Sequence, residues 1–133
     1  MKSNIHYLIF TILLLFTSFK AVNACDYSDQ VELGALASNV KVNYEVAPEP
    51  DIYFTINILN LPEDIYAVVL NNVTKEQKTY EYNGENKGNI SFKSSEIHQK
   101  VEYVITLYSK KAGCNKMVLR TLRVITPRYN PYY

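Results

Sequence analysis

Two cysteines, Cys25 and Cys114, carry the clearest chemistry in this sequence, because the chain of 133 residues has no others. In an oxidising compartment, the two cysteines of a small domain usually pair. A bridge between them would close a loop of about 90 residues and contribute at most ~4–5 kcal/mol by constraining the unfolded chain. The sequence therefore predicts a disulfide between Cys25 and Cys114.

The residues before Cys25 leave a second chemistry open. Val22-Asn23-Ala24-Cys25 partly resembles the bacterial lipobox, whose cysteine becomes an acylated N-terminus. Asn23 departs from that pattern, and Lys20 separates the site from the apolar run before it. The alternative to the disulfide is thus a membrane-tethered lipoprotein acylated at Cys25, and we expect membrane contact only in that case.

Few residues could carry catalysis. The chain after residue 24 has one histidine, His98, in a polar stretch, whereas a catalytic triad or a His-rich metal site needs several partners. The acids Glu63 and Asp64, with Glu49 and Asp51, could form at most a weak Ca²⁺ site. The four glycines are scattered and form no phosphate-binding loop. We expect no catalysis, no cofactor and no bound metal; the alternative is a small secreted enzyme or effector that uses surface carboxylates and His98.

Charge is divided unevenly along the chain. Eight acids and one base lie between residues 26 and 64, and six bases and no acid lie between residue 103 and the end. Two interpretations stay open: the first and last strands lie together and neutralise each other, or the bases bind an anionic partner such as a glycan or wall polymer. Without Lys2 and Lys20, the chain has 12 of its 14 basic residues and all 13 acidic ones, so its net charge does not favour binding to nucleic acid.

The first 24 residues have the layout of a cleavable signal peptide. Lys2 gives a positive start, residues 7–16 are an apolar run of ten, and small residues precede a cleavage point after Ala24. The run is shorter than the ~20 residues of a membrane span. We expect a secreted or cell-surface protein, with an uncleaved membrane anchor as the alternative. In a source that glycosylates exported proteins, Asn72 and Asn89 begin acceptor sequons.

The remaining sequence is typical of β-strands, being rich in Tyr, Val, Ile and Thr. Turn signals such as Asn83-Gly84 separate seven segments. The expected strands are residues 39–47, 52–60, 65–71, 78–83, 89–93, 100–110 and 116–126. A short helical turn is possible before them, lined by Val31, Leu33, Leu36 and Ala37 and capped by Asp26 or Ser28. The fold class that follows is an all-β, seven-stranded antiparallel sandwich.

Alternation along these strands predicts the core. In the third strand the parity is undecided, because Ala67 and Val69 compete with Val68 and Leu70. In an alternating sandwich, Cys25 before the first strand and Cys114 in the last hairpin meet at the same end, in agreement with the disulfide. The expected core residues are Val42, Tyr44, Phe54, Ile56, Ile58, Val68, Leu70, Tyr103, Ile105, Leu107, Leu122 and Val124.

The order of strand lengths and the position of Tyr103 early in the sixth strand resemble immunoglobulin-like sandwiches, fibronectin type III domains in particular. The resemblance covers roughly residues 39–126 and is architectural, since the chain has no Trp. The ending, Cys114 with Pro127-Arg128-Tyr129-Asn130-Pro131-Tyr132, resembles uncharacterised surface-exposed proteins of low-GC Gram-positive bacteria. Both resemblances imply an extracellular binding or interaction module without enzymatic activity.

The chain therefore divides into a signal peptide (1–24), a β-sandwich domain (25–126) and a tail (127–133). Two prolines keep the tail out of the middle of a sheet, so we expect an extended arm. The arm either folds back on the sheet or binds a partner, and we favour the partner, an extracellular protein or glycan. The expected interaction residues are Lys110, Lys111, Arg128, Tyr129, Tyr132 and Tyr133.

Overall fold

The computed structural model of this protein describes residues 25–47 and 52–129. The predicted signal peptide, the acids Glu49 and Asp51, and the tail tyrosines Tyr132 and Tyr133 lie outside the described residues. The described elements are, in order, α2 (Tyr27–Ser38), β1 (Lys41–Val46), β2 (Phe54–Leu59), β3 (Ile65–Asn71), β4 (Gln77–Glu81), β5 (Ile90–Lys93), β6 (Val101–Ser109) and β7 (Val118–Thr126).

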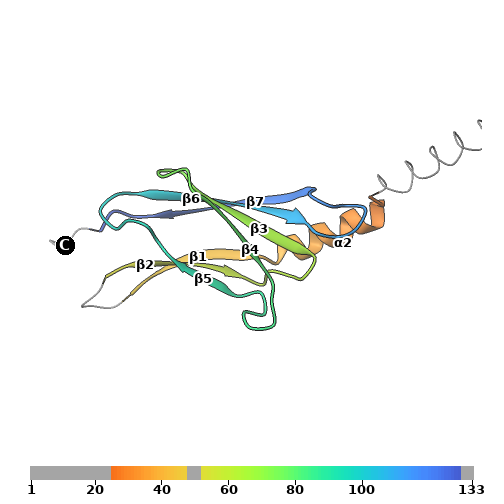
Figure 1. Ribbon diagram of the computed structural model, residues 1–133, viewed down its shortest axis with the longest axis horizontal. Coiled ribbons are helices and arrows are strands. Elements are labelled where there is room, and N and C mark those ends of the chain that lie inside the picture. The colour runs from red at the N-terminus through yellow and green to blue at the C-terminus, as the bar shows by residue number, and fades with distance from the viewer. Residues whose placement is uncertain (1–24, 48–51, 130–133) are drawn as a thin grey trace, which may run out of the picture.

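The seven strands form two antiparallel sheets that pack against each other as a sandwich (Figure 1). One sheet has the order β1-β2-β5, and the other has the order β4-β3-β6-β7. β3 and β6 are in the middle of the larger sheet, and each buries alternate residues. The expected all-β sandwich is confirmed. The one described helix is not long and apolar enough to cross a membrane.

The core lies between the sheets. Val42 and Leu122 are partly buried and pack against it. Seven of the twelve expected core residues are buried: Phe54, Ile56, Ile58, Tyr103, Ile105, Leu107 and Val124. Ile56 and Ile58 of β2 and Ile105 and Leu107 of β6 are fully buried. The prediction for the third strand is wrong at Val68 and Leu70, which are only half-buried because they point to the outer side of the sheet. The competing parity is correct: Ala67 is 0% exposed and Val69 is 4% exposed.

Tyr44 is also not a core residue, because 39% of its surface is exposed. It pairs with Ile56 and faces the same side, but β1 is an edge strand and no strand pairs with it on its other side. An opening of about 300 Å³ separates β1 from β7 and is lined in part by Val42 and Tyr44. The first strand thus covers the core only partly.

The expected helical turn is a full helix of 12 residues, α2. Leu33 and Ala37 are buried in the core, whereas Val31 is 55% exposed. Asp26 occupies the N-cap position but makes no side-chain capping hydrogen bond. The helix is therefore stabilised by its contacts with the rest of the domain and not by a capping side chain of its own.

Arg120 of β7 holds the end of this helix. Its Nη1 donates to the carbonyl oxygens of Ala37, Ser38 and Val40, each at 3.2 Å. The last carbonyls of a helix have no partner within the helix, so an arginine from another element satisfies them. The contact ties the first element of the domain to the last strand.

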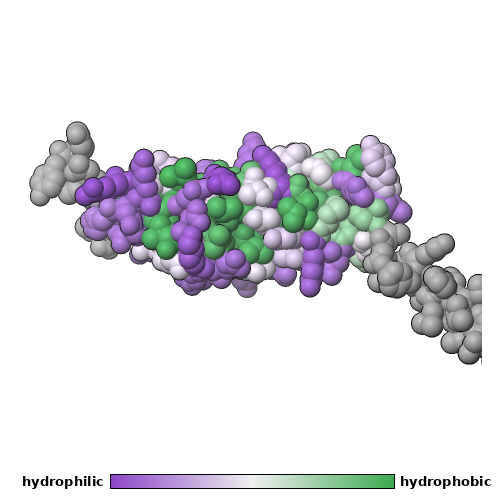
Figure 2. All heavy atoms as spheres, turned by 90° about the horizontal axis from the view of Figure 1, so that it is seen from above, coloured by the Kyte–Doolittle hydropathy of each residue, from purple (hydrophilic) through white to green (hydrophobic). Residues whose placement is uncertain are grey.

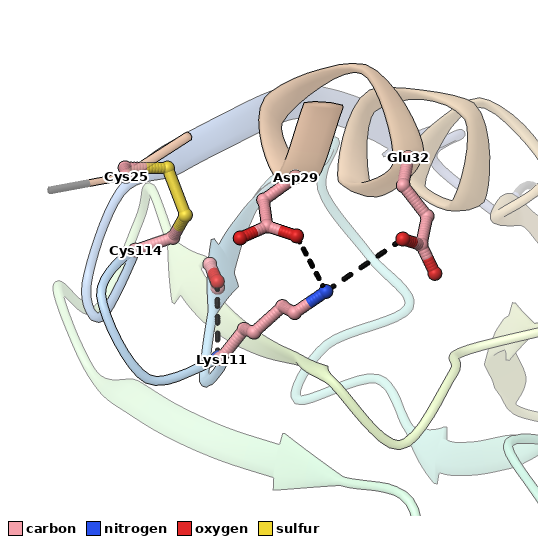
Figure 3. A network of polar contacts seen from close by, with 6 residues as sticks. Cys25, Asp29, Glu32, Lys111 and Cys114 are labelled. Carbon is pink, nitrogen blue, oxygen red and sulfur yellow. Dashed lines mark hydrogen bonds and ion pairs between the residues drawn. A yellow bond between two sulfur atoms is a disulfide. The ribbon is translucent and has the colours of Figure 1, made fainter. Parts of the chain in front are cut away.

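A covalent and ionic clamp holds the start of the same helix (Figure 3). Cys25 and Cys114 form the predicted disulfide, with their Cα atoms 4.7 Å apart. In the same hairpin, Lys111 Nζ lies 2.8 Å from Asp29 and 3.6 Å from Glu32, both on α2. The hydrogen bond that Lys111 donates to Asp29 raises the pKa of Lys111. The acidic first part of the chain and its basic last part therefore neutralise each other here.

Candidate functional site

A groove of about 360 Å³ opens on the side of the sandwich where β4 and β5 are the edge strands. Each of these strands has a partner on one side only, β3 for β4 and β2 for β5. Residues of both strands line the groove, so it runs between the two sheets. Its size is within the range of small-ligand sites, about 300–1,000 Å³.

Three aromatic rings, one from each of three strands, form the wall of the groove. Tyr80 of β4 and Phe92 of β5 stack with ring centroids 5.3 Å apart, and so connect the two sheets. Phe92 meets Tyr103 of β6 edge to face at 5.5 Å. Both geometries are favourable for aromatic pairs. Tyr80 and Phe92 are only half-buried, so this wall remains accessible.

The hydroxyl of Tyr103 fixes the loop that borders the groove. It lies 3.0 Å from the backbone nitrogen of Ser95, from which it accepts a hydrogen bond, and 2.9 Å from Ser94 Oγ. Ser95 Oγ in turn accepts from the Asn71 side chain at 2.9 Å. This side of the groove is therefore built from satisfied polar groups and has a defined shape.

One ammonium group and one carboxylate are at the groove. Lys78 is on the face of β4 that points between the sheets, since it pairs with buried Val69 and lines the groove. Lys93 also borders the groove, but it follows Phe92 in β5 and so points to the other face, where its ammonium lies 4.2 Å from the ring centre of Tyr53. Neither lysine forms an ion pair with an acid in residues 25–47 and 52–129. Glu76 is the one acid among the lining residues.

The Tyr80 phenol stays protonated over a wide pH range. Burial is the main cause that raises its pKa, followed by the negative charge of Glu76. A protonated phenol can donate a hydrogen bond. The groove therefore combines apolar ring surface with an ammonium group and a phenolic donor, which suits a ring-shaped ligand carrying an anionic group.

The structure does not bring the predicted interaction residues together at this groove. Lys111 is in the clamp with α2, and Lys110 lies 3.8 Å from Glu81. Arg128 is exposed and Tyr129 is half-buried. The Tyr129 amide donates to the Ile97 carbonyl at 2.7 Å, so the described start of the tail contacts the loop before β6.

The other candidate residues are dispersed on the surface. His98 is exposed in the loop before β6, and its amide donates to Glu96 Oε1 at 2.8 Å. Glu63 and Asp64 are exposed in the turn before β3. In the described part of the chain, no three His, Cys, Asp or Glu residues are grouped so as to hold a metal ion.

The remaining predicted sites are at the ends of strands or loops. Asn72 and Asn89 are both exposed. The side-chain nitrogen of Asn72 lies 3.4 Å from Glu102 Oε2, and Asn89 Oδ1 accepts from the Asn60 amide at 3.3 Å. The sulfur of Cys25 is joined to Cys114, so in this form it has no thiol for a lipid to occupy.

Comparisons with protein-family models, with curated proteins and with solved structures find no match to this chain.

Sequence reasoning missed the groove residues Lys78, Tyr80 and Phe92. They lie on two short strands of different sheets, and no spacing in the sequence links β4 to β5. One signal was available: Lys78 has the same parity as Tyr80, so a lysine stands where an edge strand faces inward. Lysines are common on edge strands, where they prevent pairing with another chain, so this signal alone does not indicate a groove.

Proposed function

We propose that this protein is a secreted or cell-surface binding module without catalysis, and that the groove between β4 and β5 binds an acidic sugar residue of an extracellular glycan. The observation that carries the proposal is the inward-facing Lys78 next to the accessible rings of Tyr80 and Phe92. The apolar face of a sugar ring packs on aromatic surface, and a carboxylate forms a charge-assisted hydrogen bond with an ammonium group.

The immunoglobulin-like resemblance remains part of the proposal, and two observations support it. β4 pairs with β3, so the sheets contain strands 1-2-5 and 4-3-6-7; the fourth strand thus lies in the sheet of the third, as strand C′ does in variable-type immunoglobulin domains, and not in the first sheet as strand D does in constant-type ones. The Tyr103 hydroxyl also binds the backbone upstream of its strand, as the tyrosine corner of such sandwiches does. Domains of this architecture have many functions, so the groove itself carries the argument.

The charges of the lining favour an anionic ligand over a cationic one. Lys78 presents its ammonium group to the groove and has no ion pair with a described acid, and covering it with a neutral ligand would cost free energy. A carboxylated sugar supplies the missing counter-charge and keeps hydroxyl groups for Ser95 and Tyr80. Uronic acids and sialic acids both carry a carboxylate on a hydroxylated sugar ring, so the test must distinguish between these two classes of sugar.

The test is an NMR titration of the isotope-labelled, disulfide-bonded protein with trigalacturonate, with sialyllactose and with the neutral maltotriose. We expect one of the acidic sugars, and not maltotriose, to shift the amide signals of β4, β5 and residue 95. The variant Lys78→Gln should weaken that binding about tenfold, because it removes one charge-assisted hydrogen bond.

The matched control is Lys41→Gln, which removes the same charge from exposed β1 at the other edge of the smaller sheet. It should leave the affinity unchanged. The proposal is wrong if neither acidic sugar binds, if maltotriose binds equally well, or if Lys41→Gln weakens binding as much as Lys78→Gln.

A further inference from the structure

The outer face of the larger sheet, on the side away from the core, is unusually apolar for a surface. The strand pairing places three residues of β3 side by side with three of β6 on this face: Tyr66 with Tyr108, Val68 with Thr106, and Leu70 with Val104. All six are half-buried rather than fully exposed. Tyr66 and Tyr108 stack with ring centroids 5.3 Å apart.

Two threonines and an isoleucine extend this face onto the two neighbouring strands, beside the charged Glu81 and Arg123, which pair with Tyr66 and Val104. Thr79 of β4 and Thr121 of β7 continue the row of Val68 and Thr106, and Ile125 of β7 is 55% exposed. Figure 2 views the molecule from above and shows hydrophobic patches over it, with hydrophilic side chains between them. No described helix or loop covers it; α2 is at the end of the molecule where Leu33 and Ala37 enter the core.

We infer that this outer face pairs with the same face of a second copy of the chain, giving a symmetric, sheet-to-sheet dimer. The inference is independent of the groove, which opens between the two sheets. The largest apolar patch on a typical monomer covers about 300–600 Å² and is often functional, and this face is of that size.

Charge favours a second copy over a charged partner. The charged side chains of this face are paired within the chain: Arg123 lies 2.7 Å from Glu102, and Lys110 lies 3.8 Å from Glu81. The face therefore has two positive and two negative charges and no net field. Two copies can approach without repulsion, and an oppositely charged partner would gain nothing.

The size of the face limits the area that the contact can bury. Four strands spaced ~4.8 Å apart and about six residues of strand length cover roughly 400 Å² in plan on each copy. Because side chains protrude from the sheet, the accessible area of each face is larger than its area in plan. The two faces together then bury about 1,200 Å², the lower end of specific interfaces. A dimer of this size with two sheets packed face to face should be weak, with a dissociation constant in the micromolar range.

The test is sedimentation velocity of the disulfide-bonded protein from about 5 to about 500 μM, a range chosen to cover micromolar dissociation constants. We expect the sedimentation coefficient to rise from that of a monomer to that of a dimer. The variant Thr106→Lys, which places a charge in the middle of the apolar face of each copy, should remain monomeric throughout.

The matched control is Thr55→Lys on β2 of the other sheet, which is half-buried between Glu45 and Lys93 of the flanking strands. It should dimerise as the unchanged protein does. Amide signals that shift on dilution should belong to β3 and β6, which tests the inference even if Thr106→Lys folds poorly. A monomer at all concentrations, equal loss of the dimer in both variants, or dilution shifts confined to other strands would overturn it.

Discussion

The hydroxyl of Tyr103 accepts a hydrogen bond from the backbone amide of Ser95, eight residues earlier in the chain, at 3.0 Å. One side chain of β6 thereby fixes the loop that joins the two sheets and borders the groove. The Ser94 hydroxyl, 2.9 Å away, completes the pair of polar groups around the phenol.

The variant Tyr103→Phe should lower the free energy of unfolding by about 1–3 kcal/mol, because it removes the acceptor of the Ser95 amide and one of the two partners of the buried Ser94 hydroxyl. Urea denaturation followed by circular dichroism measures the loss. Tyr108→Phe is the control, since the Tyr108 ring lies on the outer face and its hydroxyl has no hydrogen bond to any described residue. An equal effect of the two variants would contradict the role assigned to Tyr103.

Gly88 should not accept a side chain. Its φ of 84° is in the left-handed region, and a Cβ there would collide with the backbone carbonyl of Leu61, whose amide donates to Gly88 O at 2.9 Å. Gly88→Ala should destabilise the fold by at least about 2 kcal/mol. Gly84→Ala is the matched control, because its Cβ would enter open space. Thermal unfolding of both variants checks the prediction, which fails if they melt alike.

Removal of the disulfide should have one of the largest effects of any change. The bridge joins residues 89 positions apart. The double variant Cys25→Ala/Cys114→Ala should lose about 2–5 kcal/mol, mainly because its unfolded chain is less constrained. Melting of the unchanged protein with and without reductant gives the same comparison without mutation. If reductant left the melting temperature unchanged, the bridge would contribute little.

The Lys111 clamp should give the stability an alkaline pH dependence. Its hydrogen bond with Asp29 raises the pKa above the usual 10.5, so the folded state holds this proton more tightly than the unfolded state. The contribution is then complete below pH 10.5 and is lost as the pH rises through the higher folded value. Denaturation at several alkaline pH values should show a smaller loss in Lys111→Gln than in Lys110→Gln, which removes the neighbouring charge. Parallel curves would contradict the assignment.

Much of the fold could be predicted from sequence because strand alternation and turn residues are local signals. Local signals are not sufficient for β3. Ile65–Asn71 is apolar on both faces, so its sequence pattern does not indicate which face points to the core. The pairing with β6 decides it, and that contact joins residues far apart in the chain. The wrong choice of Val68 and Leu70 thus came from the same apolar outer face that we propose as a dimer contact.

The helix and the groove could be predicted only in part for a similar reason. α2 buries just Leu33 and Ala37, and Arg120, Lys111 and the disulfide hold it from the other end of the sequence. The groove depends on Tyr80 and Phe92 meeting across two sheets. The disulfide could be foreseen because two cysteines have only one way to pair.

The contacts of Arg120 with the end of α2 have a consequence for the timing of folding. The helix leaves the ribosome first, but the arginine that satisfies its last carbonyls is made about 80 residues later, as is the partner of Cys25. At roughly 5–20 residues per second, the helix waits on the order of 5 to 20 s for them. The first element made is thus among the last to dock, and until then Leu33 and Cys25 are exposed to whatever accompanies the nascent chain.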